Sequence, residues 1–337
     1  MATLGSHCAL QVLKGAKDEG FKTLVITEKR REGLYRRFKF IDEFIAVNKF
    51  SDVKKPSFVA VLKKRGAIMI PHGTLISEVG AEAIEKGFGV PIFGSRKLLN
   101  WESDRQLKEK LIKESRIRTP RSFSSPKEIK TLAIVKLHGA RGGQGYFLAD
   151  SPASFQEKKR IMEKKGILKK GTALYIQEYV VGVPVYLQFF YSPLRRELEL
   201  LGVERRYETT VDAIGRIPSQ MQEGVMPSYV VVGNIPLVLR ESLLEEVYRM
   251  GEEFVRTAAR LVPPGVIGPF CIEGVYDENA EFVAFEFSAR IVAGTNLYIL
   301  GSPYSGLIYE KPLSMGRRIA VEIKNAMRSG SLAKVLT

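Results

Sequence analysis

Short apolar runs and amphipathic stretches alternate along the first hundred residues. The apolar runs have the length of buried β-strands, whereas Ala9–Glu19 has the pattern of a helix. Strands are therefore expected at Ala2–Leu4, Lys22–Thr27, Phe44–Val47, Ala67–Pro71 and Gly89–Gly94. Because short crossovers of this kind join parallel strands, residues 1–100 are predicted to form a Rossmann-like α/β domain.

The pattern changes after residue 100. A charged amphipathic helix is predicted over Ser103–Ser115, with Ser103 or Asp104 as its N-cap. Further strands are expected at Leu132–Lys136, Tyr146–Leu148, Ala173–Val180, Val185–Tyr191 and Glu197–Glu204, with helices at Phe155–Lys165, Glu241–Leu261 and Ser314–Met327. The predicted class is α/β and α+β, with domains at 1–100, 101–185 and 186–337, which suits a chain of 337 residues.

A predicted hairpin near the C-terminus carries the clearest chemistry. Its strands, Phe270–Tyr276 and Glu281–Phe287, flank a turn signal. If the loop is the two residues Asn279-Ala280, Glu273 lies opposite Glu286, on one face with Ser288, Cys271, Val275, Phe282 and Ala284. Two carboxylates on an apolar face need a cation between them, and hard oxygen ligands suit Mg²⁺. The alternative is a solvent-facing hairpin with incidental acids.

Two turns of the N-terminal domain are candidate anion sites. Gly5-Ser6-His7 follows the first strand, and Pro71-His72-Gly73-Thr74 follows the fourth. Free backbone N–H groups at such turns bind anions, and the carboxyl ends of parallel strands form the ligand crevice of an open sheet. Together the turns could hold a phosphate and its sugar, although each alone could be an ordinary connection.

A lysine and a glycine-rich turn form the third candidate. Lys136 ends a predicted strand and is followed by His138 and by Gly139–Gly145, which includes Gly142 and Gly143. A lysine at a strand end reaches a phosphate, and a glycine turn can fold N–H groups over others. The segment Gln177-Glu178-Tyr179-Val180 could supply an adenine hinge. A plain glycine-rich hairpin is the alternative, because the P-loop pattern is missing.

The overall composition bears on the expected partners and cellular location of the protein. The formal charge is +15, but Lys and Arg are scattered in short groups, and no nucleic-acid motif accompanies them, so neither nucleic acid nor a membrane is an expected partner. Heavy Lys, Arg and Glu usage with few Asn and Gln is typical of thermophiles. No signal-peptide pattern opens the chain, and Cys8 and Cys271 suit reduced core thiols, so a cytoplasmic location is expected.

The order of these motifs resembles that of the ATP-grasp ligases. The residue sequences of several motifs resemble those of the archaeal formate-dependent FAICAR synthetases. These motifs are Leu4-Gly-Ser-His7, Pro71-His-Gly-Thr74, Glu204-Arg-Arg-Tyr-Glu208, Val232-Gly-Asn-Ile-Pro236, Gly268-Pro-Phe-Cys-Ile-Glu273 and Glu286-Phe-Ser-Ala-Arg-Ile-Val-Ala-Gly-Thr-Asn296. The resemblance implies an ATP-grasp fold behind an N-terminal Rossmann-like domain. It also implies an ADP-forming ligase of purine and IMP biosynthesis that converts AICAR to FAICAR with formate and ATP.

The resemblance assigns roles to residues. It implies Mg²⁺, or Mn²⁺ in its place, on Glu273 and Glu286. It implies contacts to AICAR from His7, Thr74 and Asn234, and to ATP from Lys136, Gly142, Gly143, Gln177, Glu178, Val180 and Glu208. Lys136, Arg290 and His7 are the expected catalytic residues, and a homo-oligomer is expected.

Two positions depart from the usual ATP-grasp pattern. Ser288 stands where many relatives have a metal-binding Asn, and Arg105 stands where a phosphate-binding Lys is common, with Lys108 as a substitute.

Two alternative functions remain open. One is an ATP-grasp ligase with another acceptor, and the other is a non-catalytic nucleotide- or RNA-binding protein.

Overall fold

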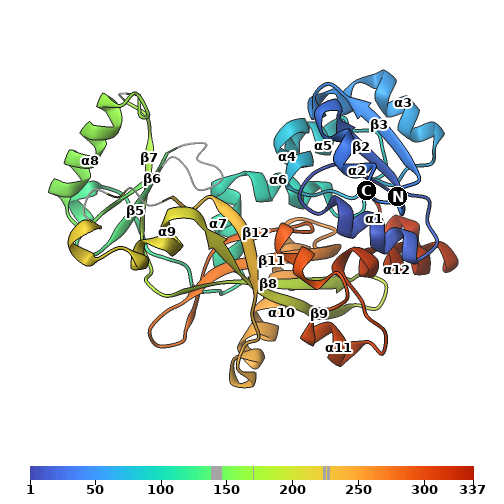
Figure 1. Cartoon of the computed structure of the whole chain (residues 1–337). Helices are drawn as coiled ribbons and strands as arrows, with labels where there is room; N and C mark the ends of the chain where they lie inside the picture. The colour runs from blue at the N-terminus through green and yellow to red at the C-terminus, as the bar shows by residue number, and fades with distance from the viewer. Residues whose placement is uncertain (138–145, 170, 223–224, 226–227) are drawn as a thin grey trace.

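The computed structural model describes residues 1–137, 146–169, 171–222, 225 and 228–337. Within these residues the strands form three separate sheets, of three, five and four strands. Figure 1 shows the three-stranded sheet at one end of the molecule, the four-stranded sheet at the other and the five-stranded sheet between them.

The N-terminal sheet is parallel and has the order β1-β2-β3, formed by Ala2–Leu4, Leu24–Glu28 and Glu43–Val47. Its helices are α1 (Ala9–Asp18), α2 (Glu32–Tyr35), α3 (Pro56–Lys64), α4 (Gly73–Val79) and α5 (Ala81–Lys86). This confirms the first three predicted strands and the first helix.

The predicted strands at Ala67–Pro71 and Gly89–Gly94 are wrong as strands. Met69 makes one isolated bridge to Ala2 and another to Ile92, so the two segments extend the sheet by single residues only. Pro71 and Pro91 lack the N–H that a longer ladder would need, which explains why the pairing stops.

A small antiparallel sheet with one covering helix, here called the lid, follows. Its order is β4-β7-β5-β6, from Ser122–Phe123, Leu174–Glu178, Ala133–Leu137 and Tyr146–Ala149. Helix α8 (Pro152–Lys164) packs on it through Phe155, whose ring centre lies 5.7 Å from that of Phe147. The helix starts earlier than predicted because Ser151 caps it and Pro152 occupies its first turn.

The central sheet is antiparallel with the order β10-β9-β8-β11-β12, formed by Val231–Pro236, Glu197–Glu208, Val183–Ser192, Gly268–Tyr276 and Phe282–Ser288. Helix α10 (Leu244–Leu261) covers one face, where Phe254 stacks on Phe270 at 5.2 Å between ring centres. Helices α6 (Arg96–Ser103) and α7 (Arg105–Glu114) contact β12. The side chain of Asp104 caps α7, as one of the two predicted caps.

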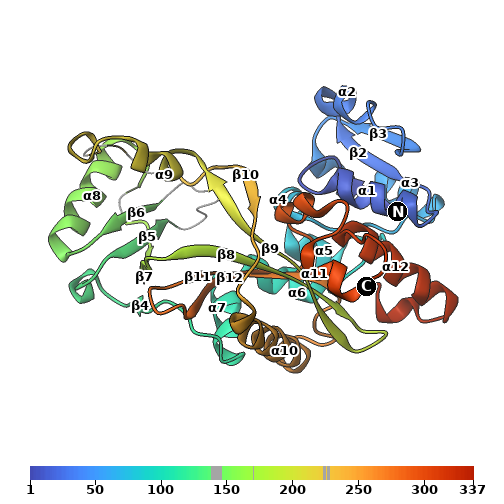
Figure 2. The same cartoon turned by 60° about the horizontal axis from the view of Figure 1, so that its bottom comes forward.

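The C-terminal segment returns to the N-terminal domain. A short helix, α9 (Thr209–Ala213), follows β9, and the last part of the chain forms α11 (Pro303–Ile308) and α12 (Met315–Arg328). Figure 2 shows α12 beside α1. The contact is close because Gly15 and Gly316 face it; a Cβ on either would overlap the backbone of the other helix. In the described part of the chain, no helix is long and apolar enough to span a membrane.

Candidate active site

Glu273 on β11 pairs directly with Glu286 on β12, as predicted. The turn, however, is not the predicted two-residue loop. Asp277 N donates to Glu281 O, and Ala280 has a φ of 59°, so Glu278, Asn279 and Ala280 form a three-residue turn. That turn alone would put Phe285 opposite Glu273.

A β-bulge corrects the register. Glu273 pairs with Glu286, whereas the next residue, Gly274, pairs with Ala284, so Phe285 is the extra residue. The bulge also corrects the predicted face. Phe282 and Ala284 belong to the hydrophobic core, whereas Phe285 contacts Tyr186, whose side chain lies on the carboxylate face.

Each carboxylate already has partners. Glu273 is buried; its Oε1 accepts a hydrogen bond from Ser288 Oγ at 2.9 Å, and its Oε2 lies 2.8 Å from Arg206 Nη2. The Arg206 guanidinium in turn lies 3.9 Å from the centre of the Tyr186 ring. Ser288 therefore orients a carboxylate, which gives this position a role although it lacks the usual Asn.

Glu286 faces Lys108 of α7, and its side chain is 44% exposed. Partial desolvation opposes the charged form of Glu286, but Lys108, Arg206 and Lys136 together outweigh it, and the pKa of Glu286 is lowered. Lys136 also lies in the field of Glu286, although burial lowers the pKa of Lys136. Two lysines thus approach the more accessible of the two acids.

The donor set fits a magnesium ion. Mg²⁺ in nucleotide sites is held by one or two carboxylates and completes its shell with phosphate oxygens and water. Glu273 and Glu286 supply those carboxylates across one residue pair. Among the described residues no group of three or more His, Cys, Asp or Glu forms a fuller protein cage.

The two N-terminal turns meet. His7 Nδ1 lies 2.7 Å from Thr74 Oγ1, and the Nε2 of His72 lies 2.9 Å from the Leu4 carbonyl oxygen. His7 has a φ of 42°, in the left-handed region that few residues other than glycine adopt. Burial first, and then Arg290, lowers the pKa of His7, so its imidazole is neutral at pH 7.

Arg290 joins the turns to the hairpin. Its guanidinium pairs with the buried Glu102 at 3.0 Å, and Glu102 also accepts a hydrogen bond from Ala289 N at 2.7 Å. The next residue, Ile291, bridges His72. Arg290 therefore lies between the hairpin acids and His7.

The lid contributes a second group. Lys136 Nζ donates to Gln177 Oε1 at 3.1 Å, and Glu178 Oε2 accepts from Arg121 N at 3.1 Å. Val180 is half-buried just beyond β7. Arg105 stacks on the Tyr175 ring at 5.1 Å, so it is directed to the lid, whereas Lys108 contacts the hairpin. The predicted contacts Gly142 and Gly143, and also His138, lie outside the described residues.

Glu208 lies where the lid meets the central sheet. Burial is the main cause that raises its pKa to about 7. Its charge also acts on Tyr146, whose hydroxyl is buried with no hydrogen-bond partner in the described part of the chain.

Sequence reasoning gave no role to Glu102, Glu204 or Arg206, although it quoted the segment that holds the last two. Glu204 is fully buried and contacts Asn234, and Arg206 contacts Glu273. Charged residues that alternate along an otherwise apolar strand were the available signal, because such residues share one face.

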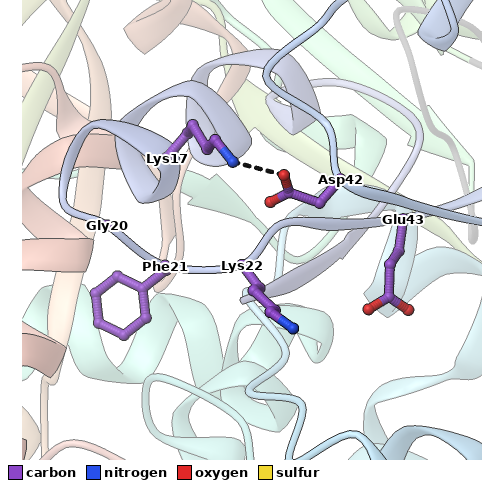
Figure 3. Close-up of a pocket in the computed structure, with 6 residues that line it drawn as sticks. All are labelled: Lys17, Gly20, Phe21, Lys22, Asp42 and Glu43. Atoms are coloured by element: carbon purple, nitrogen blue, oxygen red, sulfur yellow. Dashed lines mark hydrogen bonds and ion pairs between the residues drawn. The ribbon is translucent and has the colours of Figure 1, made fainter.

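A surface hollow of about 380 Å³ lies elsewhere. Figure 3 shows its lining residues, Lys17, Gly20, Phe21, Lys22, Asp42 and Glu43. These residues surround the amino ends of β2 and β3, opposite to the carboxyl end of β1 that precedes His7. The hollow is therefore separate from the site.

Two family models match the chain. One, described as "Protein of unknown function (DUF1246)", matches residues 1–123, and the other, "Domain of unknown function (DUF1297)", matches residues 154–337. The second covers more than half of the chain.

Named relatives match over the full length. The chain is 53% identical over 339 residues to the 5-formaminoimidazole-4-carboxamide-1-(beta)-D-ribofuranosyl 5'-monophosphate synthetase of Cenarchaeum symbiosum, covering 100% of this chain and 99% of that protein. The crystal structure of the IMP biosynthesis protein PurP from Thermococcus kodakaraensis is 32% identical, with a TM-score of 0.79 over 100% of this chain and 99% of that one.

A more distant likeness defines the fold. A biotin carboxylase from Campylobacter jejuni, in a complex with β,γ-ATP, is 13% identical, with a TM-score of 0.66 over 95% of this chain and 69% of that one. It confirms the predicted ATP-grasp fold. Together with the full-length identity above, it places the chain in the family of the 5-formaminoimidazole-4-carboxamide ribonucleotide (FAICAR) synthetases, ligases built on the ATP-grasp fold.

Proposed function

We propose that the chain is an ATP- and formate-dependent ligase that formylates the amine of AICAR and yields FAICAR, ADP and phosphate, a step of purine and IMP biosynthesis. The observation that carries this proposal is the pairing of Glu273 with Glu286 beside Lys108 and Lys136, in a chain 53% identical to a named synthetase. Two acids and two lysines at one position suit a metal–polyphosphate group.

Formate needs activation because oxide is a poor leaving group. Attack of a formate oxygen on the γ-phosphorus of ATP breaks the bond to the β–γ bridging oxygen and gives formyl phosphate and ADP. The amine of AICAR then attacks the formyl carbon, phosphate leaves, and the amine loses one proton. Every atom of ATP, formate and AICAR is thereby accounted for.

Two groups of residues are proposed to stabilise negative charge during phosphoryl transfer. Mg²⁺, or Mn²⁺, held by Glu273 and Glu286 would neutralise charge on the polyphosphate. Lys136 and Arg290 offset charge on the transferring phosphoryl group. Gln177, Glu178 and Val180 would line the adenine, with Glu208 as a further nucleotide contact. Gly142 and Gly143 are proposed phosphate contacts on sequence grounds alone.

The acceptor side is proposed to include His7, Thr74 and Asn234. The 2.7 Å contact between His7 Nδ1 and Thr74 Oγ1 supports a shared ligand, because the two turns come from distant parts of the chain. His7 either binds the phosphate of AICAR or carries a proton. Orientation of a weakly nucleophilic amine is the main task of this side.

The proposal keeps the domain division 1–100, 101–185 and 186–337, which the three separate sheets support. It also keeps a homo-oligomer in an archaeal cytoplasm. Exposed apolar side chains support self-association, since Leu300 is 78% and Leu307 83% exposed. Light scattering of the purified protein tests the oligomer.

The test of the function is phosphate release from ATP with formate and a panel of amines. The proposal expects release that needs AICAR, formate and Mg²⁺ together, with FAICAR as the product. Release with a different amine and not with AICAR would replace the acceptor but keep the ligase. No release with any amine would contradict the proposal.

A further inference from the structure

Asn234 on the edge strand β10 contacts a buried acid. Its Nδ2 donates to Glu204 Oε2 on β9, and Glu204 has no exposed surface. The ionised form of this carboxyl group can only accept hydrogen bonds. With Glu204 ionised, the amide nitrogen of Asn234 faces it, as in the structure, and this leaves Oδ1 as the atom available to a ligand.

The backbone beside Glu204 holds the carboxylate in place. The segment Ala293–Tyr298 passes so close that a Cβ on Gly294 would overlap the Glu204 carboxylate. In the same segment, Asn296 Nδ2 donates to the carbonyl oxygen of His7 at 2.9 Å. One short segment thus packs against Glu204 and also contacts the turn that carries His7, so it links the support of Asn234 to the turn of His7.

The other side of Glu204 faces the metal acids. Arg206, two residues along the same strand, pairs with Glu273. Glu204 Oε1 has no partner in good hydrogen-bond geometry among the described residues, although the side chain of Gln188 lies close enough to lower the pKa of this carboxyl group. A buried carboxylate with one unpaired oxygen is costly, and an apolar residue would pack there at lower cost. Stability alone therefore does not explain an acid at this position.

We propose that Glu204 is a positioning residue, which holds Asn234 so that its carbonyl oxygen, and not its N–H group, faces the acceptor. The proposal rests on the function proposed above. An acceptor then has to offer an N–H donor at this point, as the amine or the carboxamide of AICAR does. An analogue with a carboxylate in place of the carboxamide offers fewer donors and brings a second negative charge toward the buried Glu204.

The test uses three variants and calorimetric binding of AICAR. Glu204→Met keeps the size of the side chain but frees the amide of Asn234 to rotate, and we expect ~10-fold weaker AICAR binding from one lost or reversed hydrogen bond. Asn234→Asp places two carboxylates face to face, and we expect a larger loss. The double variant Glu204→Gln/Asn234→Asp restores the contact, because the introduced glutamine amide would donate to one oxygen of the new carboxylate and leave the other for the acceptor.

Recovery of AICAR binding in the double variant to within ~3-fold of wild type, with ATP binding unchanged in all three, supports a positioning role. Glu197→Gln, at an exposed position of the same strand, is the control and should bind AICAR as wild type does. Unchanged AICAR binding by Glu204→Met, or a double variant no better than Asn234→Asp, would overturn the inference. Failure of the wild type to bind AICAR would instead overturn the proposed function, and the inference with it.

Discussion

Glu273 lies directly opposite Glu286 only because Phe285 is inserted as a bulge between them and the turn. The three-residue turn sets one register, and the bulge shifts it by one residue for the second half of the hairpin. The bulge therefore delivers both acids to one face, while Phe282 and Ala284 stay in the core.

We predict that Glu286→Gln abolishes Mg²⁺-dependent ATP cleavage while the fold remains. Glu286 is the more accessible acid, and its loss removes one of two proposed metal ligands. The expected loss in kcat is ~100-fold or more, the size seen when a charge-stabilising group is removed. Phosphate release under saturating substrates is the measurement.

Glu278→Gln is the matched control for this experiment, because Glu278 is exposed in the turn of the same hairpin. It should turn over at the wild-type rate. Normal turnover by Glu286→Gln would show that the hairpin does not hold the metal.

We predict that Lys108→Met raises the affinity of the nucleotide-free protein for Mn²⁺. Lys108 contacts the carboxylate of Glu286 and so competes with a metal ion for it. Titration with Mn²⁺, followed by electron paramagnetic resonance, measures the affinity. Lys110→Met, at an exposed position of the same helix, is the control, and equal Mn²⁺ affinities in the two variants would argue against competition by Lys108.

We predict that His7→Ala weakens AICAR binding by ~10-fold and leaves ATP binding unchanged, because His7 contacts Thr74 and lies away from the lid. Thr74→Val should produce a comparable effect. The loss of AICAR binding free energy in the double variant should be smaller than the sum of the losses in the two single variants. Calorimetry with each ligand separately tests this. A collapse of ATP binding in His7→Ala would show that the two sides of the site are not divided as proposed.

We predict that Glu204 makes the stability of the protein fall as pH rises. Burial is the main cause that raises its pKa from 4.5 to about 7. Between these values the folded state keeps a proton that the unfolded state has lost, so the free energy of unfolding decreases with pH and stays low above pH 7. Besides burial, the pKa of Glu204 is affected by Arg206, Asn234, Glu273 and Gln188. The charge of Glu204 in turn raises the pKa of Tyr186, Cys271, Tyr298 and Cys8.

Glu204→Gln cannot lose this proton. The free energy of unfolding of the variant minus that of wild type should therefore be larger at pH 8 than at pH 4 by about 3 kcal/mol, at about 1.4 kcal/mol per unit of pKa shift. Urea denaturation at both pH values measures the difference. An equal effect of the substitution at the two pH values would mean that Glu204 has an ordinary pKa.

Local patterns in the sequence predicted much of the fold. Alternating apolar runs located β1, β2 and β3, and the turn signal located the hairpin, because these features depend on neighbouring residues. The isolated bridges of Met69 could not be predicted, because they depend on how many residues can pair between segments that are distant in the sequence. The bulge at Phe285 also depends on packing against β8.

The candidate site, like the fold, was predictable only in part from local sequence. The residue types and the strand ends pointed to His7, Thr74, Glu273 and Glu286, and the contact between His7 and Thr74 confirms that the two turns meet. Glu102 sits on a helix that sequence reasoning did not predict, and its side chain pairs with Arg290 and with the backbone N–H of Ala289. Partners of this kind come from tertiary packing and leave no mark in the local sequence.

The activation of formate as formyl phosphate is the central claim, and oxygen transfer tests it most directly. Turnover with [¹⁸O]formate, ATP, AICAR and Mg²⁺ should place one labelled oxygen in each phosphate released, with one FAICAR formed per phosphate. Mass spectrometry of the phosphate measures the label. Phosphate that carries no label from formate, at normal yields of FAICAR, would contradict the account.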